Sequence, residues 1–461
     1  MREISISAER LVAALLNLPK EKNLCLLDSC GAGHLGSHFL IAGFNPVETL
    51  EIGEADAGAS LAVLNENLAR ENTFAIFTIA YDFGLKLENI EPRPKEFPNS
   101  GEPDIFLALF DCLIVHDYDA RKTFLVGNES KFDEIERAVS RPLEPVKSID
   151  ALPKSKIFSN FTKESYIEAI EEIKERIRRG DTYQTNLTQQ IRAGLPENLA
   201  PAEIFRRLRK NHPAPFAAFL QRKNDTVISA SPERFFSIDG CGTQTAETSP
   251  QRCSRIITTS PIKGTRPRGK TFAEDKRLKR ELLSSEKDRA ENVMIVDLLR
   301  NDLGRICRFG SVRVETLCDL EQHPTLFHLV STVSGELRPE IAFPDIIKAV
   351  FPCGSITGAP KIRTMQIIDE IETAPRGLSM GAIGYSIPNS ALSAQHSALS
   401  ALNSLDLSVA IRTMVVRDSE AVFNVGGGIV IDSLPEKEYE ETLIKAKALL
   451  NSIGANAEAL S

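Results

Sequence analysis

The first third of the chain alternates short apolar runs with short polar segments. Runs of this length, rich in β-branched and aromatic residues, are typical of buried strands. They occupy residues 23–29, 73–84, 104–117 and 123–127. A link rich in proline and charge, residues 140–156, then interrupts the periodicity. The pattern predicts strands with short helices over residues 1–145, followed by a candidate domain boundary at residues 140–156 (the seam).

Beyond the seam, residues 162–180 predict an amphipathic helix that ends at Gly180. Its apolar stripe comprises Tyr166, Ile170, Ile173 and Ile177. Residues 181–192 then alternate as a strand. One face of this strand is wholly polar, with Gln184, Asn186, Thr188 and Gln190. Such a face either meets solvent or lines a polar cavity, and the pattern alone does not choose between the two.

Lys263 lies in the stretch "TTSPIKGTRPRG" at 258–269. In a regular strand, alternation places Lys263 and Thr265 on one face. A lysine ammonium is not a nucleophile, but desolvation and neighbouring cationic groups favour the neutral amine. The stretch therefore indicates either an activated lysine or a basic loop that binds anions.

A helix predicted over residues 286–305 carries two acids, Asp288 and Glu291, at i, i+3 spacing in line with its apolar stripe. Acids beside a buried stripe are costly unless they are paired or bind a metal. The alternative is an acidic first turn that complements the helix dipole.

A second i, i+3 pair, Glu438 and Glu441, stands beside the apolar stripe of a helix predicted over residues 435–450. Taken alone, this pair is best interpreted as a solvated face with a Glu441–Lys445 ion pair. The two acidic pairs together would supply four carboxylates, which suits a hard Mg2+ ion that keeps some water ligands. Neither pair indicates a metal by itself.

Three further features could bind a ligand. The three glycines at 426–428 interrupt a strand, which either bulges there or lets a ligand approach its backbone. A glycine-rich turn within residues 351–372 precedes a helix whose free N–H groups favour an anion. His328 and Arg412 each stand alone in an apolar strand. A lone histidine is usually a hydrogen-bonded core residue, whereas a buried guanidinium requires a carboxylate partner.

Composition agrees with a globular protein that has a large core. The 461 residues are 42% hydrophobic and 26% charged, with a net charge of −8. Nucleic acid or an anionic membrane would therefore have to bind a local patch, and neither partner is expected. No apolar run is long enough to span a membrane, and the acids near the N-terminus argue against an export signal. The eight cysteines show no metal-binding spacing, so reduced thiols in the cytoplasm are expected.

Seven segments appear in a fixed order along the chain: "SPERF" at 231–235, "PIKGTRPRG" at 261–269, "AENVMIVDLLRNDLGR" at 290–305, "HLVSTVSGEL" at 328–337, "CGSITGAPK" at 353–361, "AIRTMVV" at 410–416 and "GGGIVIDSLPEKEYEET" at 426–442. This set, over residues 158–455, closely resembles the chorismate-utilising enzymes. That family includes anthranilate synthase component I, aminodeoxychorismate synthase component I, isochorismate synthase and salicylate synthase. The resemblance implies an α+β fold in which two large antiparallel β-sheets pack as a sandwich. Helices would lie outside and the active site between the sheets, with residues 1–145 in the same structural unit.

The resemblance also implies roles for matching positions. Mg2+, bridging to the ring carboxylate of the substrate, would be held by Asp288, Glu291, Glu438 and Glu441. Glu233 would be the general acid on the leaving 4-hydroxyl. The enolpyruvyl side chain would be bound by Tyr385, Arg412, Gly426, Gly427 and Gly428. The ring carboxylate would be bound by Thr357 and Gly358, with His328 at the same end and Thr265 beside Lys263.

Two positions select among the reactions of the family. Members that add water at ring carbon 2 carry lysine where this chain has Gln184, so the base for water is missing and ammonia is the expected nucleophile. Anthranilate synthases typically have alanine at the position of Lys263, whereas P-I-K-G-T resembles aminodeoxychorismate synthases. In that branch the lysine amine attacks ring carbon 2 as the 4-hydroxyl leaves, and ammonia displaces it at ring carbon 4. The expected product is 4-amino-4-deoxychorismate, the precursor of 4-aminobenzoate and folate.

The chain contains no G-x-C-x-G glutaminase elbow, so ammonia is expected from a separate glutamine amidotransferase subunit. Anthranilate synthase stays an alternative that Lys263 disfavours. A catalytically silent binding subunit is the alternative from another class. Two loops, residues 241–260 and 389–408, depart from the family pattern. The sequence does not decide whether tryptophan binds near Ser29.

Overall fold

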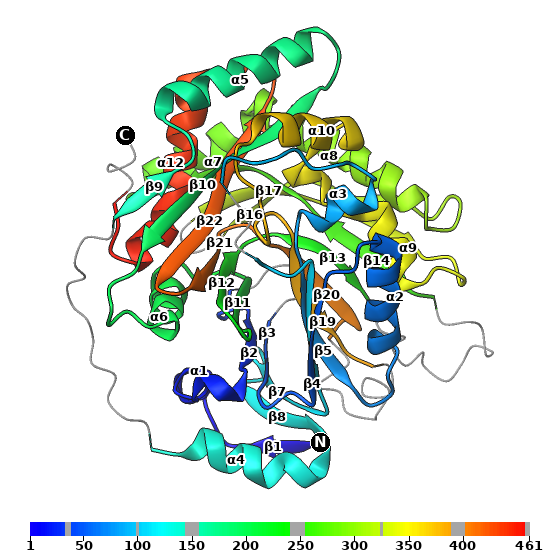
Figure 1. Cartoon of the computed structure of the whole chain (residues 1–461), viewed down its shortest axis with the longest axis vertical. Coiled ribbons are helices and arrows are strands. Elements are labelled where there is room, and N and C mark those ends of the chain that lie inside the picture. The colour runs from blue at the N-terminus through cyan, green and yellow to red at the C-terminus, as the bar shows by residue number, and fades with distance from the viewer. Residues whose placement is uncertain are drawn as a thin grey trace.

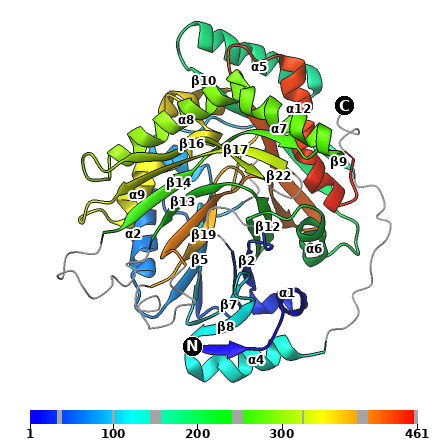
Figure 2. The ribbon, with the colours of Figure 1, turned by 180° about the vertical axis from the view of Figure 1, so that it is seen from behind.

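Two large antiparallel sheets face one another across a shared interior, with helices on their outer faces (Figure 1, Figure 2). The structure is a computed structural model that describes residues 1–32, 38–97, 101–142, 156–239, 254–322, 326–388 and 402–456. The α+β class and the two-sheet sandwich expected from the sequence are confirmed. Most of the predicted seam and of the two loops lies outside the described residues. Both loops end in strands and are therefore shorter than predicted: residues 256–260 of the first loop and residues 405–408 of the second are extended.

The first sheet has twelve strands. In spatial order they are β1 (Arg2–Ile4), β8 (Lys122–Gly127), β7 (Cys112–Asp117), β3 (Phe39–Gly43), β2 (Cys25–Asp28), β11 (Phe216–Gln221), β12 (Thr226–Ser231), β21 (Thr413–Arg417), β22 (Glu420–Ile429), β10 (Gln184–Gly194) and β18 (Gly358–Ala359), with β9 (Ile157–Ser159) paired to β10. The second sheet has ten strands. Their order is β15 (Ile262–Pro267), β17 (Leu326–Glu336), β14 (Ile256–Ser260), β13 (Arg234–Ile238), β20 (Leu405–Val409), β19 (Ala382–Ser386), β5 (Phe74–Ile79), β6 (Ile105–Phe110) and β4 (Glu48–Ile52), with β16 (Arg313–Gln322) paired to β17.

Each sheet combines strands from residues 1–145 with strands from residues 158–455. In the first sheet β2 pairs with β11, and in the second sheet β5 pairs with β19. The apolar run at 104–117 feeds both sheets, because β6 and β7 belong to different sheets on either side of Asp111. The two parts of the chain are thus joined by continuous backbone hydrogen bonding.

Helices cover the outer faces of the sheets with apolar stripes. The first sheet is covered by α1 (Ala8–Leu16), α4 (Phe132–Ser140), α6 (Pro201–Asn211) and α12 (Pro435–Ser452). The second sheet is covered by α2 (Ala57–Leu68), α8 (Glu286–Gly304) and α9 (Phe343–Val350). The predicted stripe of α5 (Lys163–Arg178) packs with α12 near β10 and β22, as Figure 1 shows at its upper edge.

The other helical segments are α3 (Phe83–Leu87), α7 (Phe272–Ser284), α10 (Lys361–Ile371) and the 3-10 turns η1 (Lys20–Lys22), η2 (Glu129–Lys131) and η3 (Gly354–Ile356). Two of them, η3 and α10, flank β18 beside β10 and so help to form the polar interior. Among the described residues, no helix combines the length and apolar character needed to cross a membrane. The cysteines that the structure describes are all free thiols.

The polar face of β10 is buried, which decides between the two interpretations of its pattern. Gln184 is 0% exposed and Asn186 7% exposed. This face is turned toward α10 and the segment after it, because the Thr188 hydroxyl donates to Glu372 Oε1 at 2.9 Å and Gln190 Nε2 donates to the Pro375 carbonyl at 2.9 Å. The strand therefore lines a polar interior and does not meet solvent.

A buried ion pair holds this interior together. The guanidinium of Arg376 donates to Glu372 Oε1 at 2.7 Å, to the Ile356 carbonyl at 2.9 Å and to the Asn186 carbonyl at 2.7 Å. It also lies over the ring of Tyr81, 4.4 Å from the ring centroid. One side chain thus ties together the end of η3, strand β10 and the end of α10.

We predict that Glu372→Gln lowers the free energy of unfolding by about 3–5 kcal/mol, because it leaves the Arg376 guanidinium buried without a charged partner. Urea unfolding followed by circular dichroism measures the change. The control is Asp297→Asn, which removes the partner of Arg300 in an exposed ion pair of 3.0 Å and should cause no measurable change. Equal stability of the two variants would contradict the structural role of the buried pair.

Candidate active site

Lys263 and Glu233 meet at Ser355. The Ser355 hydroxyl donates to Glu233 Oε1 at 2.7 Å, and Lys263 Nζ donates to the Ser355 carbonyl at 3.4 Å. Glu233 is 5% exposed, and this desolvation raises its pKa above the usual 4.5 although the Ser355 hydrogen bond and the charge of Lys263 act in the opposite direction. Glu233 therefore keeps its proton to a higher pH than an ordinary glutamate, which suits a general acid.

A bulge in β15 sets the direction of Lys263. The register to β17 shifts between Ile262 and Thr265, and Gly264 between them has a φ of +87°. The regular alternation that predicted a common face for Lys263 and Thr265 is therefore interrupted. Thr265 is exposed, and its hydroxyl lies 2.8 Å from Nδ1 of His328 on the neighbouring strand. His328 is thus a hydrogen-bonded residue of the sheet.

The three glycines of β22 lie opposite β10 in unbroken register. Gly426, Gly427 and Gly428 face Thr188, Leu187 and Asn186. The alternative of a bulge is therefore wrong, and close approach is the reason for glycine. A Cβ on Gly426 would collide with the Leu187 carbonyl oxygen.

Gly428 stands where two predicted site residues converge. A Cβ on this glycine would lie 2.7 Å from Gln184 Nε2 and 3.4 Å from Lys263 Nζ. Both side-chain polar atoms of Gln184 are buried without a hydrogen-bond partner among the described residues, and so is Asn186 Oδ1. Buried polar atoms are normally paired. Unpaired atoms beside a bare backbone therefore indicate a place where a polar ligand binds.

Thr357 and Gly358 come close to the same strand from the other side. Thr357 is 0% exposed, and its carbonyl accepts the backbone N–H of Asn186 at 2.8 Å. Gly358 has a φ of +146°, and a Cβ there would collide with the Gln184 carbonyl oxygen. The glycine-rich turn is thus fastened to β10 at the position of Gln184.

The acids of α8 and α12 converge on a lysine. Lys287 Nζ lies 3.1 Å from Glu438 Oε1 and 3.9 Å from Glu291 Oε1. Burial raises the pKa of Glu291, while the ammonium groups of Lys263 and Lys287 oppose that rise. Desolvation lowers the pKa of Lys287. The charge of Glu438, with the charges of Glu291 and Glu441, outweighs this effect, so the net shift of the pKa is upward. Glu291 and Glu438 therefore surround a position that already attracts a cation.

The other two predicted metal ligands have their own cationic partners. Asp288 Oδ2 accepts from Arg266 Nη2 at 3.1 Å, and its backbone N–H is capped by Ser285 in the first turn of α8. The predicted Glu441–Lys445 ion pair is confirmed at 2.9 Å, and the charge of Lys445 lowers the pKa of Glu441. Both expectations from the isolated patterns, the acidic first turn and the ion pair, are thus met in the structure.

Within the described residues, no group of three or more His, Cys, Asp or Glu side chains is arranged so that it could hold a metal ion. The donor chemistry nevertheless fits a hard ion, since all four predicted ligands are carboxylates and two of them, from different helices, already share one ammonium group. Asp288, Glu291, Glu438 and Glu441 are therefore suitable candidates for Mg2+.

Arg412 does not lie within a strand, which corrects the sequence prediction. It occupies the connection between β20 and β21, with a φ of +48°. Burial lowers the pKa of this guanidinium, and the charge of Glu233 opposes the shift. Glu233 is therefore the carboxylate that acts on Arg412, although no direct ion pair joins them in the described structure.

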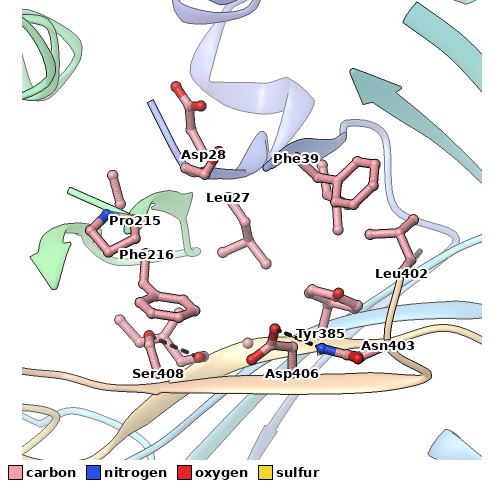
Figure 3. Close-up of a pocket in the computed structure, with 15 residues that line it drawn as sticks. Leu27, Asp28, Phe39, Pro215, Phe216, Tyr385, Leu402, Asn403, Asp406 and Ser408 are labelled. Atoms are coloured by element: carbon pink, nitrogen blue, oxygen red, sulfur yellow. Dashed lines mark hydrogen bonds between the residues drawn. The ribbon is translucent and has the colours of Figure 1, made fainter. Parts of the chain in front are cut away.

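Tyr385 lines a cavity apart from the residues that meet around Gly428. Figure 3 shows Tyr385 and Asp406 along one side of this cavity, with Leu27 and Phe39 along the other. The lining comes from both sheets and includes Ser29 but none of the residues that meet around Gly428. Burial raises the pKa of Tyr385. The structure thus does not bring Tyr385 to the glycine strand.

Sequence reasoning missed two residues that shape the site. Lys287 could have been found from its i, i+4 spacing to Glu291, which is an ordinary helical ion-pair distance. Ser355 could not, because it is 122 positions from its partner Glu233 and only the fold brings the two together.

Comparison with known proteins places the chain in a family. A family model described as "chorismate binding enzyme" matches residues 22–451. The anthranilate synthase component 1 of Aquifex aeolicus is 38% identical over 366 residues, which cover 76% of this chain and 68% of that protein. The aminodeoxychorismate synthase component 1 of Bacillus subtilis is 36% identical over 395 residues, covering 83% of this chain and 77% of that protein.

A solved structure agrees with this assignment. The anthranilate synthase component I of Streptococcus pneumoniae TIGR4 superposes with a TM-score of 0.73 at 29% identity, over 90% of this chain and 93% of that one. The relatives carry the names of two different synthases, so they agree on the substrate-binding family and differ in the reaction. The chain belongs to the chorismate-binding enzymes.

Proposed function

We propose that this protein is the component I of an aminodeoxychorismate synthase, which converts chorismate and ammonia to 4-amino-4-deoxychorismate. The observation that carries the proposal is the placement of Lys263 Nζ, 3.4 Å from the Ser355 carbonyl, on the same serine whose hydroxyl binds Glu233. A nucleophile and a general acid held by one residue can act on two carbons of one small ring.

In the first step the neutral amine of Lys263 attacks ring carbon 2. The ring double bonds shift, the bond between carbon 4 and its hydroxyl breaks, and Glu233 gives its proton to the leaving hydroxyl, which departs as water. Glu233 is then a carboxylate beside the secondary ammonium of Lys263. Its burial makes it a competent proton donor before the step, because the raised pKa keeps it protonated to higher pH.

In the second step ammonia attacks ring carbon 4. The bond between carbon 2 and the lysine nitrogen breaks, the double bonds shift back, and Lys263 leaves as the neutral amine. The new ammonium at carbon 4 returns a proton to Glu233. Gln184 cannot act as a base for water, so water is not activated for attack and ammonia is the nucleophile that completes the reaction.

Binding of the dianionic substrate is assigned to the surrounding groups. Mg2+, held by the four carboxylates of α8 and α12, would neutralise the ring carboxylate of the substrate. Thr357 and Gly358 would hold the same carboxylate, with the Thr265–His328 pair at that end. Arg412 and the three glycines of β22 would hold the enolpyruvyl group.

Ammonia is proposed to come from a glutamine amidotransferase subunit, and the enzyme to work in the cytoplasm. The name of the Bacillus subtilis relative, a component 1, supports a multi-component synthase. Anthranilate synthase activity is the second candidate, because relatives with that name are equally similar. Lys263 is the residue that favours the first candidate over the second.

Purified protein with chorismate, Mg2+ and an ammonium salt is expected to form 4-amino-4-deoxychorismate, identified by mass. Lys263→Ala should lower this rate by a factor of at least about 100, because the covalent route is lost. Lys270→Ala, which removes an exposed lysine in the loop after β15, is the control and should keep the rate. Fluorescent anthranilate as the product would contradict the proposal, and absence of any turnover would favour a silent binding subunit.

Glu233→Gln should lower the rate by about 10²–10⁴-fold, because a general acid is lost. It should also change how stability depends on pH. The folded protein holds the Glu233 proton more tightly than the unfolded chain, so wild-type stability falls as pH rises from about 4.5 through the raised pKa. The glutamine side chain of the variant does not titrate, so the stability of the variant relative to wild type should increase over that range. Urea unfolding at several pH values measures the difference, and a constant difference would refute burial of an ionisable Glu233.

A further inference from the structure

Two of the four carboxylates of α8 and α12 are bridged by one ammonium group. Lys287 Nζ is 3.1 Å from Glu438 Oε1, on α12, and 3.9 Å from Glu291 Oε1, on its own helix α8. Two carboxylates from different helices thus share one positive charge. This is the relation that the same two groups would have to a bound divalent cation.

Glu438 is held firmly, whereas the lysine is not. The side chain of Glu438 is 6% exposed, and its Oε1 also accepts the Ser433 hydroxyl at 2.7 Å. The side chain of Lys287 is 49% exposed and carries its charge on a long flexible stem. Moving the ammonium into water therefore costs little, while moving the carboxylates would disturb a packed interior.

The cations that pair with Asp288 and Glu441 are anchored by partners outside the cluster. Arg266 also donates to Glu281 Oε1 at 2.9 Å. Lys445 also donates to the Gly426 carbonyl at 2.8 Å. In the part of the chain that the structure describes, the polar partners found for Lys287 are only Glu438 and Glu291. Lys287 is thus the cation that can leave without breaking another contact.

We propose that Lys287 is a tethered counter-ion that occupies the metal position in the metal-free protein and swings into solvent when a divalent cation binds. The inference rests on the proposed metal site and adds a residue that sets its affinity. The lysine keeps the buried carboxylates neutralised without metal. It also weakens metal binding, because the metal ion must displace the tethered ammonium group of Lys287, whose effective concentration at the carboxylates is high.

The first test is binding of Mn2+ to the full chain, measured by electron paramagnetic resonance of the free ion without chorismate. Mn2+ is a suitable probe because carboxylate sites accept it in place of Mg2+. Lys287→Met should bind Mn2+ with a Kd at least about tenfold lower than wild type, because the competitor is removed. Lys437→Met removes an exposed positive charge next to Glu438 that does not bridge the acids, and its Kd should stay within about twofold of wild type.

Equal Kd values for wild type and Lys287→Met would overturn the counter-ion role while leaving the metal site in place. Equal gains for Lys287→Met and Lys437→Met would also overturn it, because they would reflect net charge alone. If neither wild type nor variants bind Mn2+, the proposed metal site fails together with the inference. None of these outcomes depends on which product the enzyme forms from chorismate.

Thermal unfolding gives a second, independent readout. In the presence of a chelator, Lys287→Met should melt at a lower temperature than wild type, because Glu291 and Glu438 then repel each other without a counter-ion. Saturating Mg2+ should raise the melting temperature of the variant more than that of wild type and close the gap between them. A gap that Mg2+ does not close would show a purely structural lysine and overturn the proposal.

Discussion

The ion pair between Arg376 and Glu372 is the constraint on which the geometry of the site depends. A buried guanidinium must satisfy its donors, and this one does so with the carbonyls of Ile356 and Asn186 as well as the carboxylate. The Glu372 carboxylate in turn accepts the backbone N–H of Thr188. Strand β10 and the turn that precedes Thr357 are therefore fixed relative to one another by a single charged group.

The remaining parts of the site follow from the position of β10. Strand β22 pairs with β10 in unbroken register through the glycines at positions 426–428. A Cβ on Gly426 would collide with β10, and a Cβ on Gly428 would crowd Gln184. Gly428 then exposes its backbone to Gln184 and Lys263, and the bulge at Gly264 turns Lys263 toward Ser355. The site thus has polar groups without internal partners on one side and a buried acid on the other.

Charge within the site is balanced locally, although the chain as a whole is acidic. Each of the four carboxylates proposed for the metal has a lysine or arginine next to it. A substrate with two carboxylates would bring two more negative charges into this interior. Arg412 acts electrostatically on Glu233 and is available to meet them. The arrangement is consistent with a protein that binds an anion inside a negatively charged molecule.

Much of this could be predicted from the sequence. The ordered motifs led to the two-sheet fold, and the stripe of α5 and the Glu441–Lys445 pair were predicted from helical periodicity. The sequence pattern gave the wrong prediction where tertiary geometry sets the direction or the position of a side chain. Alternation could not foresee the bulge beside Lys263, and an apolar flank made Arg412 look like a strand residue although it lies in a connection with positive φ. Tyr385 was assigned to the enolpyruvyl site by resemblance, but it faces a cavity lined by strands of both sheets.

The central claim is that Lys263 forms a covalent bond to the ring with Glu233 as the proton donor. The most direct measurement is peptide mass spectrometry of the protein incubated with chorismate and Mg2+ in the absence of ammonia. The account predicts an adduct with the mass of chorismate less a molecule of water on the peptide that contains Lys263, and its loss in Glu233→Gln. Turnover to 4-amino-4-deoxychorismate without such an adduct, or an adduct on a different residue, would contradict it.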